Sequence, residues 1–215
     1  MLADFASPKH KDKACDLCTG CGIIPLLWCA NPNGCQDITC ADIQPEACEL
    51  VARSIELNEL QDRVSCLRAD IRKPDARLTA GVFDVVTVNP PYNIPGTGAP
   101  SREESSLTAR HEVLCTIDDA VNAGARLLKF GGRMCMCHKP QRLSDLIFAF
   151  RSRGCEPKRL RFVQQTGESE PWLVLIEGKK GAKTGLRVLP PLLMTQNGEK
   201  SQEYKKIYSS FYNNM

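Results

Sequence analysis

The chain has 215 residues, which is enough for one α/β domain with a substantial core and too few for two ordinary domains. Its charged fraction of 25% and hydrophobic fraction of 42% are typical of a soluble globular protein, and no apolar run is long enough to cross a bilayer, which excludes a membrane-spanning protein. The net charge is +3, and Lys and Arg outnumber Asp and Glu within residues 151–215, which permits a phosphate-bearing partner without requiring one.

The 12 cysteines lie inside strand and helix patterns rather than in a short secreted framework, so we expect reduced thiols. The N-terminus lacks the basic, apolar and small-residue order of a signal peptide, so we expect a cytoplasmic protein. Cys15, Cys18 and Cys21 have a spacing that could ligate an iron–sulfur cluster. A fourth ligand at a supporting spacing is missing and a glycine-loop motif explains the same residues better, so we predict no metal site.

The first predicted strand covers residues 14–17 and leads into a glycine loop at residues 18–22 and a helix over residues 23–30. Strand, glycine loop and helix form the first turn of a Rossmann-like unit, in which small residues let backbone N–H groups approach a ligand. Gly20 and Gly22 are present, but the third glycine of the dinucleotide fingerprint is missing. The loop therefore indicates a nucleotide-like ligand and argues against hydride transfer.

A second predicted strand covers residues 37–42 and ends at Asp42, before a helix over residues 44–57. An acid at the tip of this strand can hold a ribose diol, because two hydroxyls donate to one carboxylate. Asp42 could equally cap the following helix, and both interpretations stay open at this point. A third predicted strand, residues 64–69, ends at Asp70.

The fourth predicted strand is the apolar run from Phe83 to Asn89, which Pro90, Pro91 and Tyr92 follow. Because proline lacks an N–H and keeps the residue before it out of the helical region, these residues form a stiff loop with free carbonyls. At the carboxyl edge of a parallel sheet the loop presents the Asn89 amide oxygen, the Pro90 carbonyl and the Tyr92 ring close together. Two acceptors and a stacking surface suit a planar group that bears an NH2; the alternative is a rigid turn with an aromatic ring packed beneath it.

The rest of the chain continues the alternation of strands and helices. We predict a mobile polar loop at 93–110, a helix at 112–129 closed by Gly131 and Gly132, a strand at 133–137, a helix at 141–151, an antiparallel strand pair at 157–163 and 172–177, and a docked C-terminal helix at 203–212.

The order of these elements predicts a Rossmann-like α/β fold: a seven-stranded, mostly parallel sheet with a C-terminal antiparallel hairpin and helices on both faces. We expect a single domain over residues 1–215, with residues 1–13 as a lead-in and residues 178–215 as a C-terminal extension.

Residues 16–22, Asp-Leu-Cys-Thr-Gly-Cys-Gly, together with Asp42 and the Asn89–Tyr92 corner, resemble the class I S-adenosylmethionine-dependent methyltransferases over nearly the whole chain. The resemblance implies S-adenosyl-L-methionine as the cofactor. The residues that it assigns to the cofactor are Asp16, Cys18, Thr19, Gly20, Gly22, Asp42, Asp70 and Asn89. Cys18 stands where the family usually has glycine, so its side chain needs room near the methionine part of the cofactor, and a positive φ there would strain the backbone.

The Asn89–Tyr92 corner is similar to the signature of enzymes that methylate the amino groups of adenine, cytosine, guanine or glutamine. The stretches that accompany it resemble the bacterial tRNA adenine-N(6) methyltransferases; they are residues 109–112, 127–132, 138–143, 188–192 and 203–208. This resemblance implies tRNA as the substrate, and in particular an anticodon-loop adenine of valine tRNA. Relative to that subfamily the chain begins late, because it lacks a segment that usually precedes residues 2–6.

The resemblance assigns catalysis to Asn89, Pro90 and Tyr92. The side chain of Asn89 and the carbonyl of Pro90 would accept the hydrogens of the target amine and offset the positive charge that grows during transfer. The ring of Tyr92 would stack on the flipped base.

Substrate binding is assigned to Pro91, Tyr92, Arg110 and His111, although Arg110 could instead cap a helix or pair with a neighbouring acid. The basic residues of the strand at 157–163 are further candidates for phosphate contacts, or form a solvated edge; they are Lys158, Arg159 and Arg161.

Two other functions stay open. Methyltransferases of protein glutamine and of ribosomal RNA guanine use the same corner, so these substrates are the alternative for an enzyme. A chain that had lost the cofactor through Cys18 or the late start would be a non-catalytic RNA-binding module. The sequence predicts no particular oligomeric state.

Overall fold

The computed structural model describes residues 1–31, 33–92 and 115–212. Its centre is a nine-stranded sheet of order β3-β2-β1-β4-β5-β7-β6-β8, in which β9 also pairs with β6. The strands of this sheet are β1 (Lys13–Leu17), β2 (Asp37–Asp42), β3 (Val64–Arg68), β4 (Phe83–Val88), β5 (Leu128–His138), β6 (Cys155–Gln164), β7 (Pro171–Lys180), β8 (Arg187–Val188) and β9 (Leu192–Leu193). A separate small hairpin joins β10 (Thr195–Gln196) and β11 (Glu199–Lys200).

The strands β1 to β5 run parallel, as the alternation of strands and helices along the chain predicts. In the middle of the sheet, β1 and β4 are parallel neighbours, with Leu17 opposite Val88. The carboxyl ends of these two strands therefore meet at one edge, so the residues that follow Leu17 and Val88 are neighbours in space.

The strand β7 is antiparallel and lies between β5 and β6. This arrangement confirms the predicted hairpin and the mostly parallel sheet. The seven predicted strands are all present, and the two short strands β8 and β9 extend the sheet by pairing with β6. Two-residue strands carry no periodic signal, so the sequence could not indicate them.

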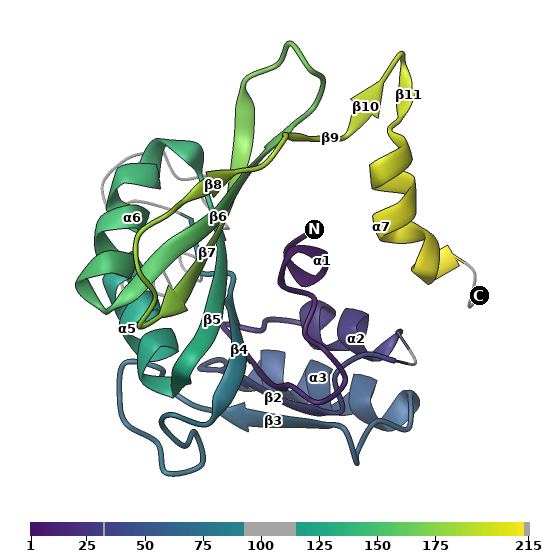
Figure 1. Cartoon of the computed structure of the whole chain (residues 1–215). Coiled ribbons are helices and arrows are strands. Elements are labelled where there is room, and N and C mark those ends of the chain that lie inside the picture. The colour runs from purple at the N-terminus through teal and green to yellow at the C-terminus, as the bar shows by residue number, and fades with distance from the viewer. Residues whose placement is uncertain (32, 93–114, 213–215) are drawn as a thin grey trace, which may run out of the picture.

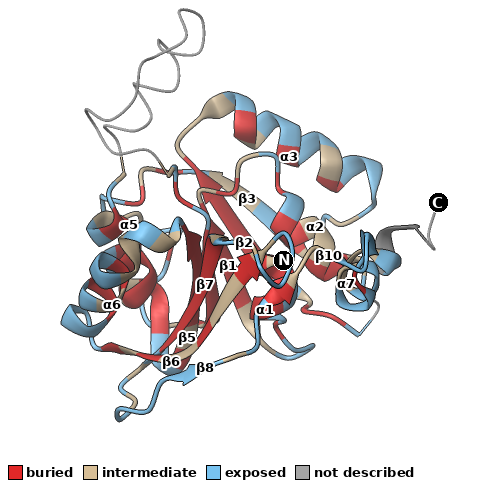
Figure 2. Ribbon diagram, turned by 90° about the horizontal axis from the view of Figure 1, so that it is seen from above, coloured by how far each residue is buried: buried red, intermediate tan, exposed pale blue. Residues whose placement is uncertain are grey.

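Helices cover both faces of the sheet, as predicted (Figure 1). On one face lie α1 (Leu2–Ala6), α2 (Ile23–Cys29) and α3 (Pro45–Leu57), and on the other lie α5 (Ile117–Leu127) and α6 (Leu143–Ser152), which the short 3-10 helix η1 (Pro140–Arg142) precedes. The buried residues concentrate in the sheet between these layers (Figure 2). None of the described helices is long and apolar enough to span a membrane.

The boundary between α5 and β5 corrects the sequence analysis. Gly131 and Gly132 do not close the helix; α5 ends at Leu127 and β5 begins at the next residue, so the glycines lie inside the strand. Gly131 has a φ of 80°, and the pairing with β4 shifts register here. A Cβ on Gly132 would lie 2.9 Å from the carbonyl oxygen of Phe83, so the pair serves a β-bulge. The first predicted residues of this helix, 112–114, and the loop at 93–110 lie outside the described residues.

The two ends of the chain also form helices. The lead-in contains α1, which the sequence did not predict and which packs against α2 and β5. The C-terminal helix α7 (Gln202–Tyr212) is present as predicted, and its Ile207 packs against the core on the α2 side of the sheet. Thus α1 adds four buried residues to the core, whereas α7 contacts the core through partly buried residues such as Ile207.

Candidate active site

The loop after β1 turns sharply, because three of its residues have left-handed backbone. The φ values are 54° at Cys18, 55° at Gly20 and 77° at Gly22. A Cβ on Gly22 would lie 2.9 Å from a methyl group of Val51, so this glycine lets α2 approach α3 closely. Cys18 carries a side chain in a conformation that favours glycine, so the strain that the sequence analysis expected is present. The neighbouring Cys115 thiol and burial raise the pKa of the Cys18 thiol.

Asp16 is fully buried beneath this loop. Its carboxylate accepts hydrogen bonds from the hydroxyl of Thr19 at 2.7 Å and from that of Thr87 at 2.5 Å. Burial raises the pKa of Asp16 to about 7, and the two hydroxyl donors counteract part of that shift. Through these hydrogen bonds Asp16 connects the loop residue Thr19 to Thr87 of β4. Neither Asp16 nor Thr19 lines the cavity that is described next.

Asp42 ends β2 and holds two neighbouring segments together. Its carboxylate oxygens accept from the N–H of Gly20 at 2.9 Å and from the N–H of Gln44 at 3.0 Å. The N-cap residue of α3 is Gln44, so Asp42 does not cap this helix. Its carboxylate instead lies at the wall of a cavity between the glycine loop and α3.

That cavity, called here the polar cavity, has a volume of about 300 Å³. Its lining residues are Cys18, Gly20, Asp42, Ile43, Gln44, Ala69, Asp70, Ile71, Asn89, Pro91 and Cys115. The guanidinium of Arg72 donates two hydrogen bonds to the Asp70 carboxylate, at 2.9 and 2.8 Å. These bonds lower the pKa of the Asp70 carboxyl below its usual range. The residues predicted to bind the cofactor thus lie around one space, except Asp16, Thr19 and Gly22, which shape the loop.

The proline corner follows β4 at the same edge. The amide oxygen of Asn89 accepts a hydrogen bond from the Tyr92 hydroxyl and another from the Cys137 thiol at 3.0 Å. The ring of Tyr92 meets His138 edge-on, with centroids 5.3 Å apart. Tyr92 is therefore folded inward, and its half-buried ring is engaged with β5. Burial and Cys137 raise the pKa of its hydroxyl, which stays protonated at neutral pH.

A second, largely apolar space lies on the other side of Asn89 and is called here the apolar chamber. Its volume is about 580 Å³, and its lining residues are Met1, Leu2, Ala3, Ile23, Ile24, Leu27, Asn89, Tyr92, Cys137, Trp172, Leu173 and Tyr208. Among the described residues, Asn89 alone lines both spaces. Sequence analysis missed this chamber because its walls come from α1, α2, β7 and α7, which no local motif connects.

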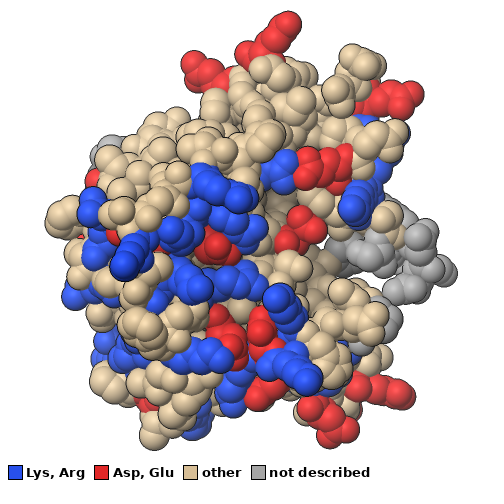
Figure 3. Space-filling view, viewed as in Figure 1, with Lys and Arg blue, Asp and Glu red and all other residues tan. Residues whose placement is uncertain are grey.

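The basic residues of β6 are occupied within the fold. Arg161 forms a two-pronged ion pair with Glu203 of α7, at 2.7 and 2.6 Å. Lys158 donates to the carbonyl of Lys183, at 3.2 Å, and Arg159 pairs with Glu177. Lys and Arg still gather on the face that carries β6 and β8 (Figure 3). Arg110 and His111 lie outside the described residues, so their predicted contacts remain predictions.

The fold and this site define a class of protein. A parallel sheet with a glycine turn after β1, an acid after β2, and Asn-Pro-Pro-Tyr after β4, with an antiparallel β7 beside β5, is the arrangement of the class I S-adenosylmethionine-dependent methyltransferases. The model of one family within this class, described as the methyltransferase small domain, matches residues 1–142. The chain belongs to this family.

Individual proteins are similar over different lengths. A tRNA1(Val) (adenine(37)-N6)-methyltransferase of Porphyromonas gingivalis is 25% identical over 211 residues, which cover 95% of this chain and 80% of that protein. The rRNA N(6)-adenosine-methyltransferase metl-5 of Caenorhabditis elegans is 36% identical, but the match spans only 37% of each chain. A crystal structure of a predicted O-methyltransferase from Agrobacterium tumefaciens has a TM-score of 0.77 at 19% identity, covering 97% of this chain and 94% of that one. This last likeness supports the fold alone.

Proposed function

We propose that the protein transfers a methyl group from S-adenosylmethionine to the N(6) amine of an adenine in RNA, with the anticodon-loop adenine of valine tRNA as the first substrate to test. The observation that carries the proposal is the place of Asn89, between the polar cavity and the apolar chamber. Ligands bound in these two spaces would meet at Asn89, and bringing two reactants together in a fixed orientation is what methyl transfer requires. Relatives that align over most of this chain are named as adenine methyltransferases, which supports adenine as the acceptor.

The polar cavity suits S-adenosylmethionine. Each oxygen of Asp42 uses one lone pair for a backbone N–H and keeps another for a ribose hydroxyl. Ala69 and Ile71 offer apolar sides for a flat adenine ring. Among the described residues, and apart from Gly20 and its two chain neighbours, no atom lies within 4 Å of the place where a Cβ of Gly20 would stand, so the glycine leaves room for a ligand. When bound, the cofactor supplies a methyl group that its sulfonium already activates.

Asn89 and Pro90 of the corner would then bind and polarise the acceptor amine. The adenine amine is a poor nucleophile, because its lone pair is delocalised into the ring. The Asn89 amide oxygen and the Pro90 carbonyl would accept its two hydrogens and stabilise the positive charge that develops on the nitrogen. Since Tyr92 and Cys137 donate to that amide oxygen, one of them has to release it when the amine enters. The freed Tyr92 ring would stack on the base.

The apolar chamber favours a base over a protein side chain. A volume of about 580 Å³ with Tyr92 and Trp172 in its walls suits a flat purine, which buries both faces against aromatic and aliphatic groups. A glutamine side chain has no aromatic face to stack. The chamber therefore supports the adenine acceptor above the glutamine alternative.

The test is the incubation of the protein with tritiated S-adenosylmethionine and three acceptors: transcribed valine tRNA, ribosomal RNA and a peptide-release factor. Label in the tRNA, with N(6)-methyladenosine in its nucleoside digest, supports the proposal. Label only in protein contradicts it. Calorimetric titration with S-adenosylmethionine comes first, because absence of binding would favour the non-catalytic RNA-binding module.

An adenine in ribosomal RNA is the second candidate. It is favoured by the 36% identity to the metl-5 enzyme, a higher identity than that of the tRNA enzymes over a shorter stretch. The same experiment separates the two, because N(6)-methyladenosine would then appear in the ribosomal RNA digest and not in that of tRNA. Guanine methylation in ribosomal RNA, the third possibility, would give N(2)-methylguanosine.

A further inference from the structure

The helix α1 is too short to hold itself together. It has five residues, and helices of this length are unstable in water without tertiary contacts. Four of its residues are buried, and they are Leu2, Ala3, Phe5 and Ala6. Contacts with the rest of the fold must therefore determine where α1 lies.

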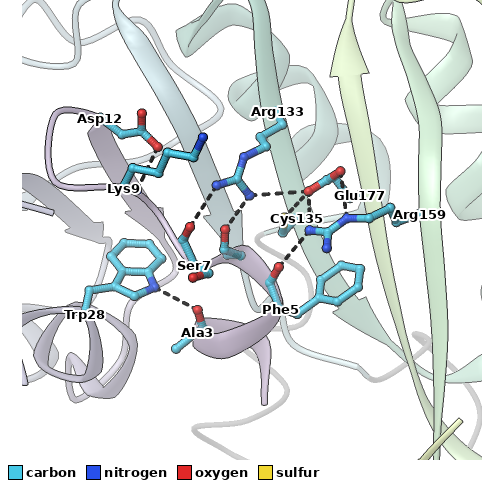
Figure 4. A network of polar contacts seen from close by, with 11 residues as sticks. Ala3, Phe5, Ser7, Lys9, Asp12, Trp28, Arg133, Cys135, Arg159 and Glu177 are labelled. Carbon is cyan, nitrogen blue, oxygen red and sulfur yellow. Dashed lines mark hydrogen bonds and ion pairs between the residues drawn. The ribbon is translucent and has the colours of Figure 1, made fainter. Parts of the chain in front are cut away.

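The end of α1 is bound by two arginines that flank one carboxylate, and the set Arg133, Glu177 and Arg159 is called here the clamp (Figure 4). Arg159 donates to the carbonyl of Phe5 at 2.9 Å, and its guanidinium lies 4.6 Å from the centre of the Phe5 ring. Arg133 donates to the carbonyls of Ala6 and Ser7, the latter at 3.1 Å. These are carbonyls that the end of a helix leaves without intrahelical partners, so the clamp satisfies them.

The clamp itself is built on rigid strands. Glu177 on β7 is only 7% exposed, and Arg159 on β6 is its direct partner in the sheet register. Its carboxylate binds Arg159 at 2.6 and 3.0 Å and Arg133 of β5 at 3.3 Å. A buried carboxylate needs such compensation, and the loss of one partner leaves an uncompensated charge. The three side chains thus hold one another in place across three strands.

The other end of α1 forms part of the wall of the apolar chamber. Met1, Leu2 and Ala3 line that chamber, and the indole of Trp28 in α2 donates to the carbonyl of Ala3 at 3.0 Å. On its far side α1 borders a polar hollow of about 410 Å³ that Arg133, Arg159 and Glu177 help to line. With a hollow on each side, α1 is held by its four buried apolar residues and by these few polar contacts. The residues that line the polar cavity include none from α1.

We propose that the clamp is a positioning device that holds α1 as a wall of the apolar chamber and thereby sets the affinity for the acceptor without affecting the affinity for the cofactor. This inference rests on the proposed function insofar as it names the chamber as the acceptor site. The position of α1 itself can be tested without any activity.

The first experiment uses tryptophan fluorescence. The chain has two tryptophans, so Trp172→Phe leaves Trp28, which is 5% exposed under α1, as the only reporter. In this background Arg159→Ala and Glu177→Gln should shift the Trp28 emission to the red and speed proteolysis within residues 7–13, because α1 leaves its place. Arg187→Ala, an exposed arginine on β8 of the same basic face, is the matched control and should change neither. Unchanged emission and proteolysis in the clamp variants would overturn the inference.

The second experiment separates acceptor from cofactor. With wild-type activity established, Arg159→Ala should raise the KM for RNA by about 10-fold or more, because a displaced α1 no longer forms the wall of the apolar chamber, while calorimetry shows S-adenosylmethionine affinity within about 2-fold of wild type. Arg159→Lys keeps the positive charge but loses the guanidinium that binds Glu177 through two nitrogens. This variant should recover part of the affinity for RNA that Arg159→Ala loses. An equal loss of cofactor affinity would mean general damage to the fold and would overturn the positioning role.

The two experiments keep the hypotheses apart. If the wild-type protein methylates no RNA, the proposed function fails, while the fluorescence result still decides whether the clamp holds α1. If Arg159→Ala does not fold, the milder variants Arg159→Lys and Arg133→Lys, which keep the positive charge beside Glu177, should show the same changes at smaller size.

Discussion

The hydroxyl of Tyr92 donates a hydrogen bond to the amide oxygen of Asn89, and the thiol of Cys137 donates to the same oxygen at 3.0 Å. An amide oxygen has two lone pairs, so both are occupied. One of the two acceptors that the sequence analysis placed at this corner, the Asn89 amide oxygen, is therefore already occupied by its own neighbours. Of the two donors, Tyr92 is the better candidate to release the Asn89 amide oxygen when an acceptor binds, because its ring also has to turn if it is to stack on a base.

Tyr92 offers a test that separates its ring from its hydroxyl. Tyr92→Phe removes the competing donor and keeps the ring, so we expect kcat/KM for RNA to stay within a few fold of wild type or to rise. Tyr92→Ala removes both and should lower kcat/KM by about 10-fold to 100-fold, because stacking on a base contributes roughly 1–3 kcal/mol. Steady-state kinetics with RNA measure the difference. Equal losses in the two variants would assign the effect to the hydroxyl and contradict the stacking role.

Asn89 should act on the transition state rather than on cofactor binding. We expect Asn89→Ala to slow methyl transfer by about 100-fold or more, as the removal of a transition-state acceptor does, and to leave S-adenosylmethionine affinity within a few fold. Single-turnover kinetics and calorimetry give the two quantities. The control is Asn58→Ala, at an exposed position after α3. An unchanged rate in Asn89→Ala would remove this residue from the mechanism.

Cys18 provides a test of backbone strain. Cys18→Gly should raise the free energy of unfolding by up to about 1 kcal/mol, because left-handed backbone costs roughly 1–2 kcal/mol for a residue with a Cβ, and the greater freedom of glycine in the unfolded chain offsets part of the gain. Cys18→Ala keeps the Cβ and should give no such gain. Urea unfolding compares the two. Equal stabilities would show that the thiol, and not the φ of 54°, determines the effect.

The raised pKa of the buried Asp16 carboxyl predicts that the stability of the protein depends on pH. Its folded pKa of about 7 lies above the ordinary 3.8, so between these values the folded state binds more protons than the unfolded state. The contribution of Asp16 to stability is thus complete below about pH 4 and is lost as the pH rises through about 7. Asp16→Asn should flatten the fall in melting temperature between pH 5 and pH 7, and Asp62→Asn, at an exposed site, should not. Parallel pH profiles for wild type and Asp16→Asn would contradict the shift.

The sheet could be predicted because each strand carries its own pattern. The buried run Phe83–Val88 and the acids that end β2 and β3 are local signals, and the parallel connections place their ends at one edge. Asp42 was assigned to the loop edge on that basis, and the structure adds that it binds Gly20 and Gln44 instead of capping α3.

The apolar chamber could not be predicted, because distant residues build it. Ala3, Leu27 and Trp172 come from three elements that meet only in the folded chain. The roles of Arg159 and Arg161 were missed for the same reason: charge on an edge strand is typical of a solvated face, and only the fold shows that Glu177 and Glu203 stand opposite. The prediction that Gly131 and Gly132 close a helix was wrong, because a glycine pair is equally typical of a helix end and of a bulge.

The ion pair between Arg161 and Glu203 affects how binding experiments at different ionic strengths should be read. Glu203 is 47% exposed, so added salt screens its attraction to Arg161 and weakens the hold on α7, whose Tyr208 lines the apolar chamber. Salt also displaces any polynucleotide by competing for its phosphates. A steep loss of RNA affinity with added KCl would thus combine two effects, and only a charge-independent anchor for the C-terminal helix, such as an engineered disulfide, would isolate the number of phosphates that the protein contacts.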